Sequence, residues 1–192
     1  MKFKEIYLLG GGNKMKVKAL LVVLIIGLVL FTIWYFTPKN YTQTLNGVYY
    51  QLGNGEEAHD IEIILDGKLH HRFNGKITFK GTVEIRGTNV PSIPEDKTEI
   101  VLDYHGENRA PIFSAFRVVD YKGRVEPDIY YYGLLYTNDK FSEFTIAVFN
   151  DGDSETWSPS NGFMITAPAR DKQVAIKISQ NLMKKFDITL NP

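Results

Sequence analysis

Three of the four histidines in the chain lie in one short stretch, residues 58–73, together with several acidic side chains. Imidazole and carboxylate groups bind zinc and copper, and they also serve as general acids and bases in catalysis. The stretch reads AHDIEIILDGKLHHRF, in which apolar and polar residues alternate as they do in half-buried strands. Any chemistry here therefore depends on which side chains share a face of a strand.

The Asp66-Gly67 pair predicts a β-hairpin between strands over residues 59–65 and 69–73. A two-residue loop would set Ile61 and Ile63 opposite Arg72 and His70. A three-residue loop with the glycine in the left-handed conformation separates apolar from polar side chains, so we prefer it. It places on one face Ile61, Ile63, Leu65, Leu69, His71 and Phe73, and on the other Asp60, Glu62, His70 and Arg72.

Neighbouring residues of a strand point to opposite faces, so His70 and His71 cannot bind one metal ion together. We expect Glu62, His70 and Arg72 to form an exposed charge cluster across the hairpin. His59 and His71 form a weaker candidate for a zinc or copper site, which requires that their strands pair closely. No third ligand accompanies them, and we predict no cofactor.

A second candidate metal site lies in the segment NDGDSETWSP, where Asp151, Asp153 and Glu155 alternate after Asn150. Their spacing resembles part of a calcium loop but lacks the twelve-residue pattern that ends in glutamate. We therefore interpret the segment as a polar hairpin loop, with calcium binding as the alternative.

Tyrosines suggest a binding surface. Tyr130, Tyr132 and Tyr136 fall two or four residues apart, so on a regular strand they share one face, with Tyr131 on the other. Most strand aromatics are structural. An exposed row would nevertheless form a flat platform for a sugar, a lipid or a protein, and this is the leading candidate for a binding site.

Sequence motifs of catalysis are missing from the chain. The sequence has no Gly-x-Ser-x-Gly, no His-Glu-x-x-His and no phosphate-binding glycine loop, and His105 stands alone. We therefore predict that the protein is not an enzyme. A hydrolase with two carboxylates stays as an alternative, because such pairs have no fixed spacing in sequence.

Charge and cysteine content exclude further classes. The chain has 22 basic and 22 acidic residues, but five lysines and one glutamate lie in the first 18, so the remainder has a net charge of −4. This balance does not favour nucleic acid as a partner. With no cysteine, the chain can form neither disulfides nor cysteine zinc sites.

Residues 19–36, ALLVVLIIGLVLFTIWYF, are uncharged and would span about 27 Å as a helix. Lysines precede them and aromatic residues end them, which predicts a transmembrane helix with residues 1–18 in the cytoplasm and the larger C-terminal part outside. A cleaved signal peptide is the alternative, but no Ala-x-Ala-like site follows. The run Gly10-Gly11-Gly12 before Met15 suggests that translation begins at Met15.

After a linker over residues 37–46, nine strand-like runs indicate an antiparallel β domain over residues 47–167, either a barrel or a sandwich. The runs cover residues 47–52, 59–65, 69–73, 76–86, 99–104, 112–119, 129–136, 143–149 and 162–166. A C-terminal helix over residues 168–187 should pack on this domain, with Asp171 as its cap and an apolar stripe that includes Ala175 and Leu182.

The segments FNGKITFKGTVEIRG, GLLYTNDKFSEFTIAVFN and TWSPSNGFMITAPARDKQVAIKISQNLM, after a basic start and a single span, resemble small uncharacterised membrane-anchored proteins of Gram-positive, spore-forming bacteria. This resemblance implies no activity. The start LNGVYY is similar to the Gly-x-Trp start of lipocalin-type barrels, with tyrosine in place of tryptophan.

Together these features predict a cell-membrane protein with an extracytoplasmic, non-enzymatic binding module for an envelope polysaccharide, a lipid or a membrane protein. The alternatives are an accessory or regulatory subunit of a membrane complex, a lipocalin-like ligand carrier and an envelope hydrolase.

Overall fold

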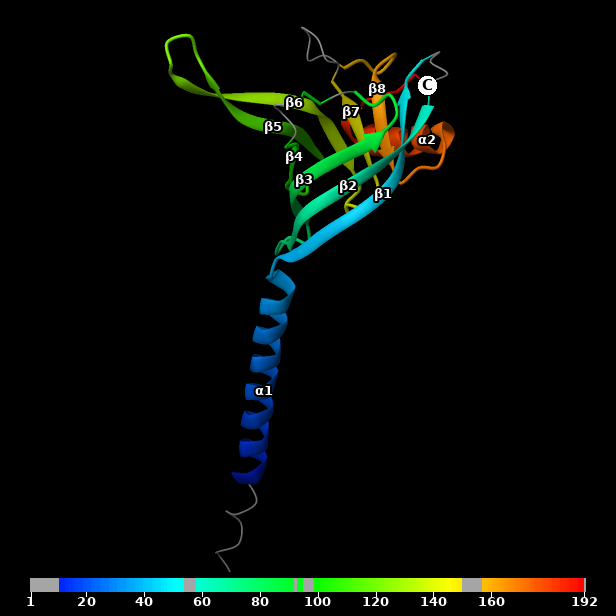
Figure 1. The fold of residues 1–192 in the computed structure, drawn as a ribbon. Coiled ribbons are helices and arrows are strands. Elements are labelled where there is room, and N and C mark those ends of the chain that lie inside the picture. The colour runs from blue at the N-terminus through cyan, green and yellow to red at the C-terminus, as the bar shows by residue number, and fades with distance from the viewer. Residues whose placement is uncertain (1–10, 54–57, 92, 95–98, 150–156, 192) are drawn as a thin grey trace, which may run out of the picture. The chain divides into compact units, whose positions relative to one another are not determined.

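An apolar helix, α1 (Gly11–Phe36), opens the part of the chain that the structure describes (Figure 1). The structure is a computed structural model, and it describes residues 11–53, 58–91, 93–94, 99–149 and 157–191. The segment Lys16–Phe36 is long and apolar enough to cross a membrane, and none of its residues is buried. Such a helix serves either as a membrane anchor or as a signal sequence.

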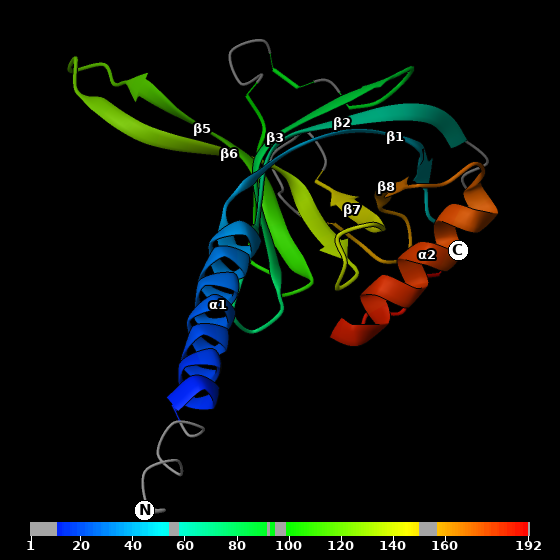
Figure 2. The same cartoon turned by 90° about the horizontal axis from the view of Figure 1, so that it is seen from below.

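Residues 38–192 form a separate unit, an antiparallel barrel in which each strand pairs with the next and β1 closes on β8 (Figures 1 and 2). This confirms a β domain with a C-terminal helix and selects a barrel over a sandwich. Its strands are β1 (Lys39–Gln51), β2 (Ala58–His71), β3 (Ile77–Gly87), β4 (Val101–Tyr104), β5 (Arg109–Val119), β6 (Val125–Thr137), β7 (Phe144–Val148) and β8 (Phe163–Ala167).

Two predicted boundaries are wrong. β1 begins at Lys39, so most of the expected linker over residues 37–46 is strand. The Asp66-Gly67 pair lies within β2 and makes no hairpin, because β2 pairs with β1 and β3 without interruption from Ile61 to Leu69. The nine predicted runs therefore correspond to eight strands. The predicted apolar grouping is confirmed in part: Ile61, Ile63 and Leu65 are buried on the inner face, whereas Phe73 is 90% exposed.

Gly67 is required in the strand rather than in a turn. It pairs directly with Gly81 of β3, and the ring of Phe79 lies beside both, with its Cζ 2.9 and 2.8 Å from the positions of added Cβ atoms. A Cβ on Gly67 would overlap the carbonyl oxygen of Lys80, and one on Gly81 that of Asp66. The glycine pair thus lets two strands approach closely where a buried aromatic ring fills the barrel.

A C-terminal helix, α2 (Lys172–Met183), covers the outer face of the barrel and continues as a short 3-10 turn, η2 (Lys184–Phe186). As predicted, Asp171 caps it by accepting a hydrogen bond from the amide of Val174 at 2.8 Å. The helix is shorter than the predicted 168–187. Its apolar side packs on the outer residues of the sheet in a cluster that includes Val48, Tyr50, Met164, Ala175 and Leu182.

Four hydroxyl groups hold α2 to the barrel at the centre of this cluster. Ser179 Oγ lies 2.8 Å from Tyr50 Oη, 2.8 Å from Thr145 Oγ1 and 2.7 Å from Thr166 Oγ1. All four residues are buried. Burial raises the pKa of Tyr50, which keeps its hydroxyl neutral and able to donate a hydrogen bond.

Replacing Gly81 with alanine should destabilise the barrel by about 1–3 kcal/mol, because the new methyl group meets backbone that cannot move away freely. Urea unfolding of residues 38–192 measures the loss. Lys68→Ala, a change to an exposed residue of the neighbouring strand, is the control and should stay within about 0.5 kcal/mol. Equal stability of the two variants would contradict this account of the glycine pair.

Ser179→Ala should lower the free energy of unfolding by about 1–3 kcal/mol, because it leaves buried hydroxyls of the barrel without their common partner. Gln180→Ala changes the adjacent, exposed residue of the same helix and should have little effect. Thermal unfolding followed by circular dichroism compares the two. The account fails if Ser179→Ala unfolds at the same temperature as the wild type.

Candidate interaction surface

Strands β5 and β6 extend beyond the barrel as a two-stranded ribbon, visible in both views of the fold (Figures 1 and 2). β4 pairs with β5 only as far as Phe113, and β7 pairs with β6 only from Gly133. The six pairs from Ser114–Tyr130 to Val119–Val125 therefore have no further strand partner among the described residues. We call residues 114–130 the arm, which is about 20 Å long at 3.3 Å per residue.

One face of the arm is apolar and exposed. Residues directly opposite in an antiparallel pair share a face, so the register assigns the outer face without ambiguity. Arg117 is the charged residue of this face. Near the tip of the arm the face is aliphatic, with Val119 64% and Val125 59% exposed. We call this surface the outer face of the arm. It consists of Ala115, Arg117, Val119, Val125, Pro127 and Ile129, and continues into Phe113 and Tyr131 at the barrel.

The outer wall of a water-exposed barrel normally carries polar side chains. Contiguous exposed apolar residues on a soluble surface mark contact sites for proteins or membranes. The arm is therefore the strongest candidate for a functional surface in the described part of the chain.

A tight turn at the tip holds the arm in shape. The carboxylate of Asp120 accepts hydrogen bonds from the amides of Lys122 and Arg124 at 2.8 Å, and Arg124 Nη2 lies 2.8 Å from Asp120 Oδ2. These hydrogen bonds lower the pKa of Asp120, with the amide of Arg124 as the largest cause. Tyr121 at the apex is 90% exposed. The tip is thus a hydrogen-bonded turn that exposes the ring of Tyr121.

The predicted platform of Tyr130, Tyr132 and Tyr136 does not exist. Tyr132 is an extra residue in β6 at a β-bulge, which shifts the alternation of the strand. Tyr132 therefore lies buried inside the barrel, with Tyr130 packed against the same core, whereas Tyr136 lies buried beneath α2 on the other face. Tyr131, predicted on the other face of the strand, adjoins the exposed outer face.

The predicted pair of His59 and His71 is also wrong as a metal site. Both lie on β2, twelve residues apart, so about 40 Å of strand separates them. Glu62 pairs with Arg86 of β3 at 3.6 Å and not with His70 or Arg72. Among the described residues no group of three or more histidine or acidic side chains is arranged to hold a metal ion. Asp151, Asp153 and Glu155 lie outside the described residues.

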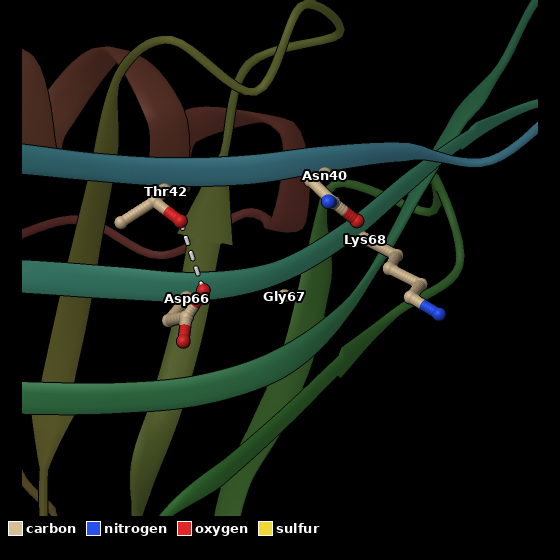
Figure 3. Close-up of a pocket in the computed structure, with 5 residues that line it drawn as sticks. All are labelled: Asn40, Thr42, Asp66, Gly67 and Lys68. Atoms are coloured by element: carbon tan, nitrogen blue, oxygen red, sulfur yellow. Dashed lines mark hydrogen bonds between the residues drawn. The ribbon is translucent and has the colours of Figure 1, made fainter.

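The outer wall near the start of β1 carries a polar hollow of about 350 Å³ over Gly67 (Figure 3). Asn40, Thr42, Asp66 and Lys68 surround it, and Thr42 Oγ1 donates a hydrogen bond to Asp66 Oδ1 at 2.9 Å. In Figure 3 the amine of Lys68 points away from this pair. The hollow therefore lacks the convergent acid and base that catalysis requires.

A larger groove of about 560 Å³ crosses β1, β2 and β3 beside the segment that leads into α2. Its charged lining residues are Asp60, Glu62, Arg86 and Arg170. Glu62 contacts Arg86, and Arg170 contacts Asp171 at 3.3 Å, so acids and bases neutralise one another. Exposed pairs of this kind are typical of a solvated surface.

Aromatic rings fill the barrel interior at the end where β1 begins. Phe141, held with a positive φ of 54° in the loop between β6 and β7, stacks on Tyr104 at 5.0 Å and on Phe79 at 5.2 Å. Tyr41 and Phe144 complete the group. These packed rings stabilise the barrel. They occupy that end of its interior, which does not favour a ligand there.

Acid should loosen the tip of the arm. The lowered pKa of Asp120 means that its carboxylate stabilises the folded turn above the ordinary value of 3.8, and this contribution disappears as the pH falls through the lower folded value. We expect the amide signals of Lys122 and Arg124 to shift together in an NMR titration below pH 3.8. In Asp120→Asn this titration should vanish. If the amide shifts persisted in that variant, an acid other than Asp120 would be their cause.

Comparisons of this chain with protein-family models, with curated proteins and with solved structures found no match.

Proposed function

We propose that this protein is a single-pass membrane protein whose β-barrel is an extracytoplasmic, non-enzymatic interaction module, with the outer face of the arm as its docking surface. The exposed aliphatic side chains on an ordered ribbon are the observation that carries the proposal. α1 supplies the anchor, with the lysine-rich start in the cytoplasm and the barrel outside.

The chemistry of the outer face favours a protein as the partner. Sugars stack on exposed aromatic rings, but the outer face of the arm presents the aliphatic Val119, Val125 and Ile129, with Tyr121 at the apex and Tyr131 at the barrel. Arg117 is its one charge. A complementary partner has an apolar patch with a carboxylate positioned for Arg117, an arrangement common at the centres of protein interfaces.

A role as accessory subunit of a membrane complex is compatible with this surface, since the partner would then be a membrane protein. A lipocalin-like carrier is less well supported, because aromatic rings occupy one end of the interior. An envelope hydrolase is least supported, because Asp66 in the first hollow accepts from Thr42 while Lys68 points away, and Glu62 in the larger groove pairs with Arg86.

Photocrosslinking in native membranes tests the proposal. The chain has no cysteine, so a single cysteine can be labelled specifically with a benzophenone maleimide. Val119→Cys places the label on the outer face, and Val118→Cys, also exposed, places it on the opposite face of the same strand. We expect one discrete adduct from position 119 and little from position 118.

Adding Val125→Asp should abolish the adduct at position 119, because a buried interface charge typically weakens binding by about 2 kcal/mol or more, roughly 30-fold. Val125 is exposed, so the barrel should keep its melting temperature. An unchanged adduct with Val125→Asp would refute the outer face as the docking surface.

A further inference from the structure

The turn between β2 and β3 presents a phenylalanine to the outside. The amide of Arg72 donates to the carbonyl of Lys76 at 2.9 Å, and the amide of Gly75 donates to the carbonyl of Arg72 at 3.0 Å. Gly75 has a φ of 76°, so the turn is a short, ordered loop. Within it the side chain of Phe73 is 90% exposed. Exposure of a whole phenyl ring on a rigid turn is costly in water.

Basic side chains surround this phenylalanine on one face of the β2–β3 hairpin. Lys68 and His70 alternate along β2 and Lys80 lies on β3, which places these three on the outward side. Arg72 and Lys76 flank the turn, where the amide of Arg72 donates to the carbonyl of Lys76. We call these five residues the basic stripe. Lys68 lies directly opposite Lys80, an arrangement of like charges that is unfavourable by itself.

Acidic side chains offset the basic stripe only in part. Asp103 Oδ2 lies 3.9 Å from Lys80 Nζ, and Asp66 shares the face with Lys68. Asp139, whose pKa is lowered mainly by a hydrogen bond from Asn108, lies near enough to Lys76 that this lysine contributes to the lowering. Among the described residues Arg72 contacts His105, with its Nη2 3.3 Å from His105 Nδ1. The stripe therefore keeps an excess of positive charge, which an anionic surface would neutralise.

The β2–β3 turn lies at the end of the barrel where the chain arrives from α1. Two residues separate Phe36 of α1 from Lys39 of β1, so the chain can span at most about 11 Å between them. Lys39 pairs with Leu69, and Phe73 follows four residues later, about 13 Å further along the hairpin. The length of the chain thus keeps the turn close to any membrane that holds α1.

We propose that the β2–β3 turn docks on the bilayer, with Phe73 among the lipids at the interface and the basic stripe on anionic phospholipid headgroups. Aromatic residues partition to the membrane interface, and each nearby lysine or arginine strengthens attachment to an anionic surface by about fivefold. This inference rests on the anchor of the proposed function and is independent of the arm. The contact restricts how the barrel can tilt on its short tether.

Single-cysteine labelling of the full chain in lipid nanodiscs tests the contact. Phe73→Cys and Tyr121→Cys form a matched pair, because both side chains are 90% exposed and lie on turns at opposite ends of the barrel. Each variant carries an environment-sensitive fluorophore, in discs of phosphatidylglycerol with phosphatidylcholine and in discs of phosphatidylcholine alone. We expect the label at position 73, in the anionic discs, to show blue-shifted emission and quenching by lipid-borne quenchers. The label at position 121 should stay accessible to aqueous quencher.

Neutralising two members of the basic stripe provides the second measurement. In Arg72→Gln/Lys76→Gln, the contact should weaken about 25-fold, at roughly fivefold per charge, and the label at position 73 should return toward water. Both charges are exposed, so the barrel should stay folded.

The outcomes separate the two proposals. A chain that does not co-elute with the discs has no anchor, which overturns the proposed function and this inference with it. A chain that co-elutes while both labels are equally open to water overturns the docking alone. If the label at position 73 is equally shielded from water in discs without anionic lipid, the role of the basic stripe is overturned. If it is shielded from water but not quenched from the lipid, the turn contacts protein and the docking on the bilayer is overturned.

Discussion

Closure of the barrel depends on a short seam between its first and last strands. β1 and β8 pair through the four residues Val48–Gln51 and Phe163–Thr166, and apolar side chains cover this seam on both sides. Inside lies the main core, with Tyr49 and Ile165, and outside lies α2, fixed by Ser179 to hydroxyls of β1, β7 and β8. The helix is therefore part of the closure, and loss of the helix and opening of the seam should be one cooperative event.

Unequal strand lengths create the two surfaces that we associate with function. β4, β7 and β8 have four or five residues, whereas β1, β2, β5 and β6 have 11 to 14. Long strands beside short ones must extend beyond the barrel wall, because part of their length has no further neighbour. At one end the excess of β5 and β6 forms the arm. At the other, β2 and β3 extend past Lys39 to the turn that carries Phe73.

Periodicity in the sequence predicted most of the fold, because alternation reports directly which face is buried. Ile61, Ile63 and Leu65 behave as expected even though the hairpin assigned to Asp66-Gly67 is wrong. That pair has the composition of a turn, but Gly67 serves a close approach to Gly81, a partner 14 residues away that local sequence does not identify. The turn with a left-handed glycine that was expected at Gly67 lies instead at Gly75, between β2 and β3.

The tyrosine platform failed for a related reason. One inserted residue at Tyr132 reverses the faces of all that follow in β6, and a bulge depends on the register with β5 rather than on the residues of β6. The arm itself left a signal in the sequence, since apolar residues persist on both sides of the polar turn at residues 120–124. What the sequence could not supply was the shortness of β4 and β7, which leaves this hairpin without neighbours and its outer face uncovered.

The edges of the arm bear on how it would bind the proposed partner. A two-stranded ribbon exposes two open edges, which can pair with strands of other chains. The strand at one of these edges, β6, contains Pro127, which has no amide hydrogen, between the acidic residues Glu126 and Asp128. Proline and charge at an edge both oppose the addition of a strand. The outer face has no such protection, so the physical design of the arm favours contact through side chains on its face and discourages extension of its sheet.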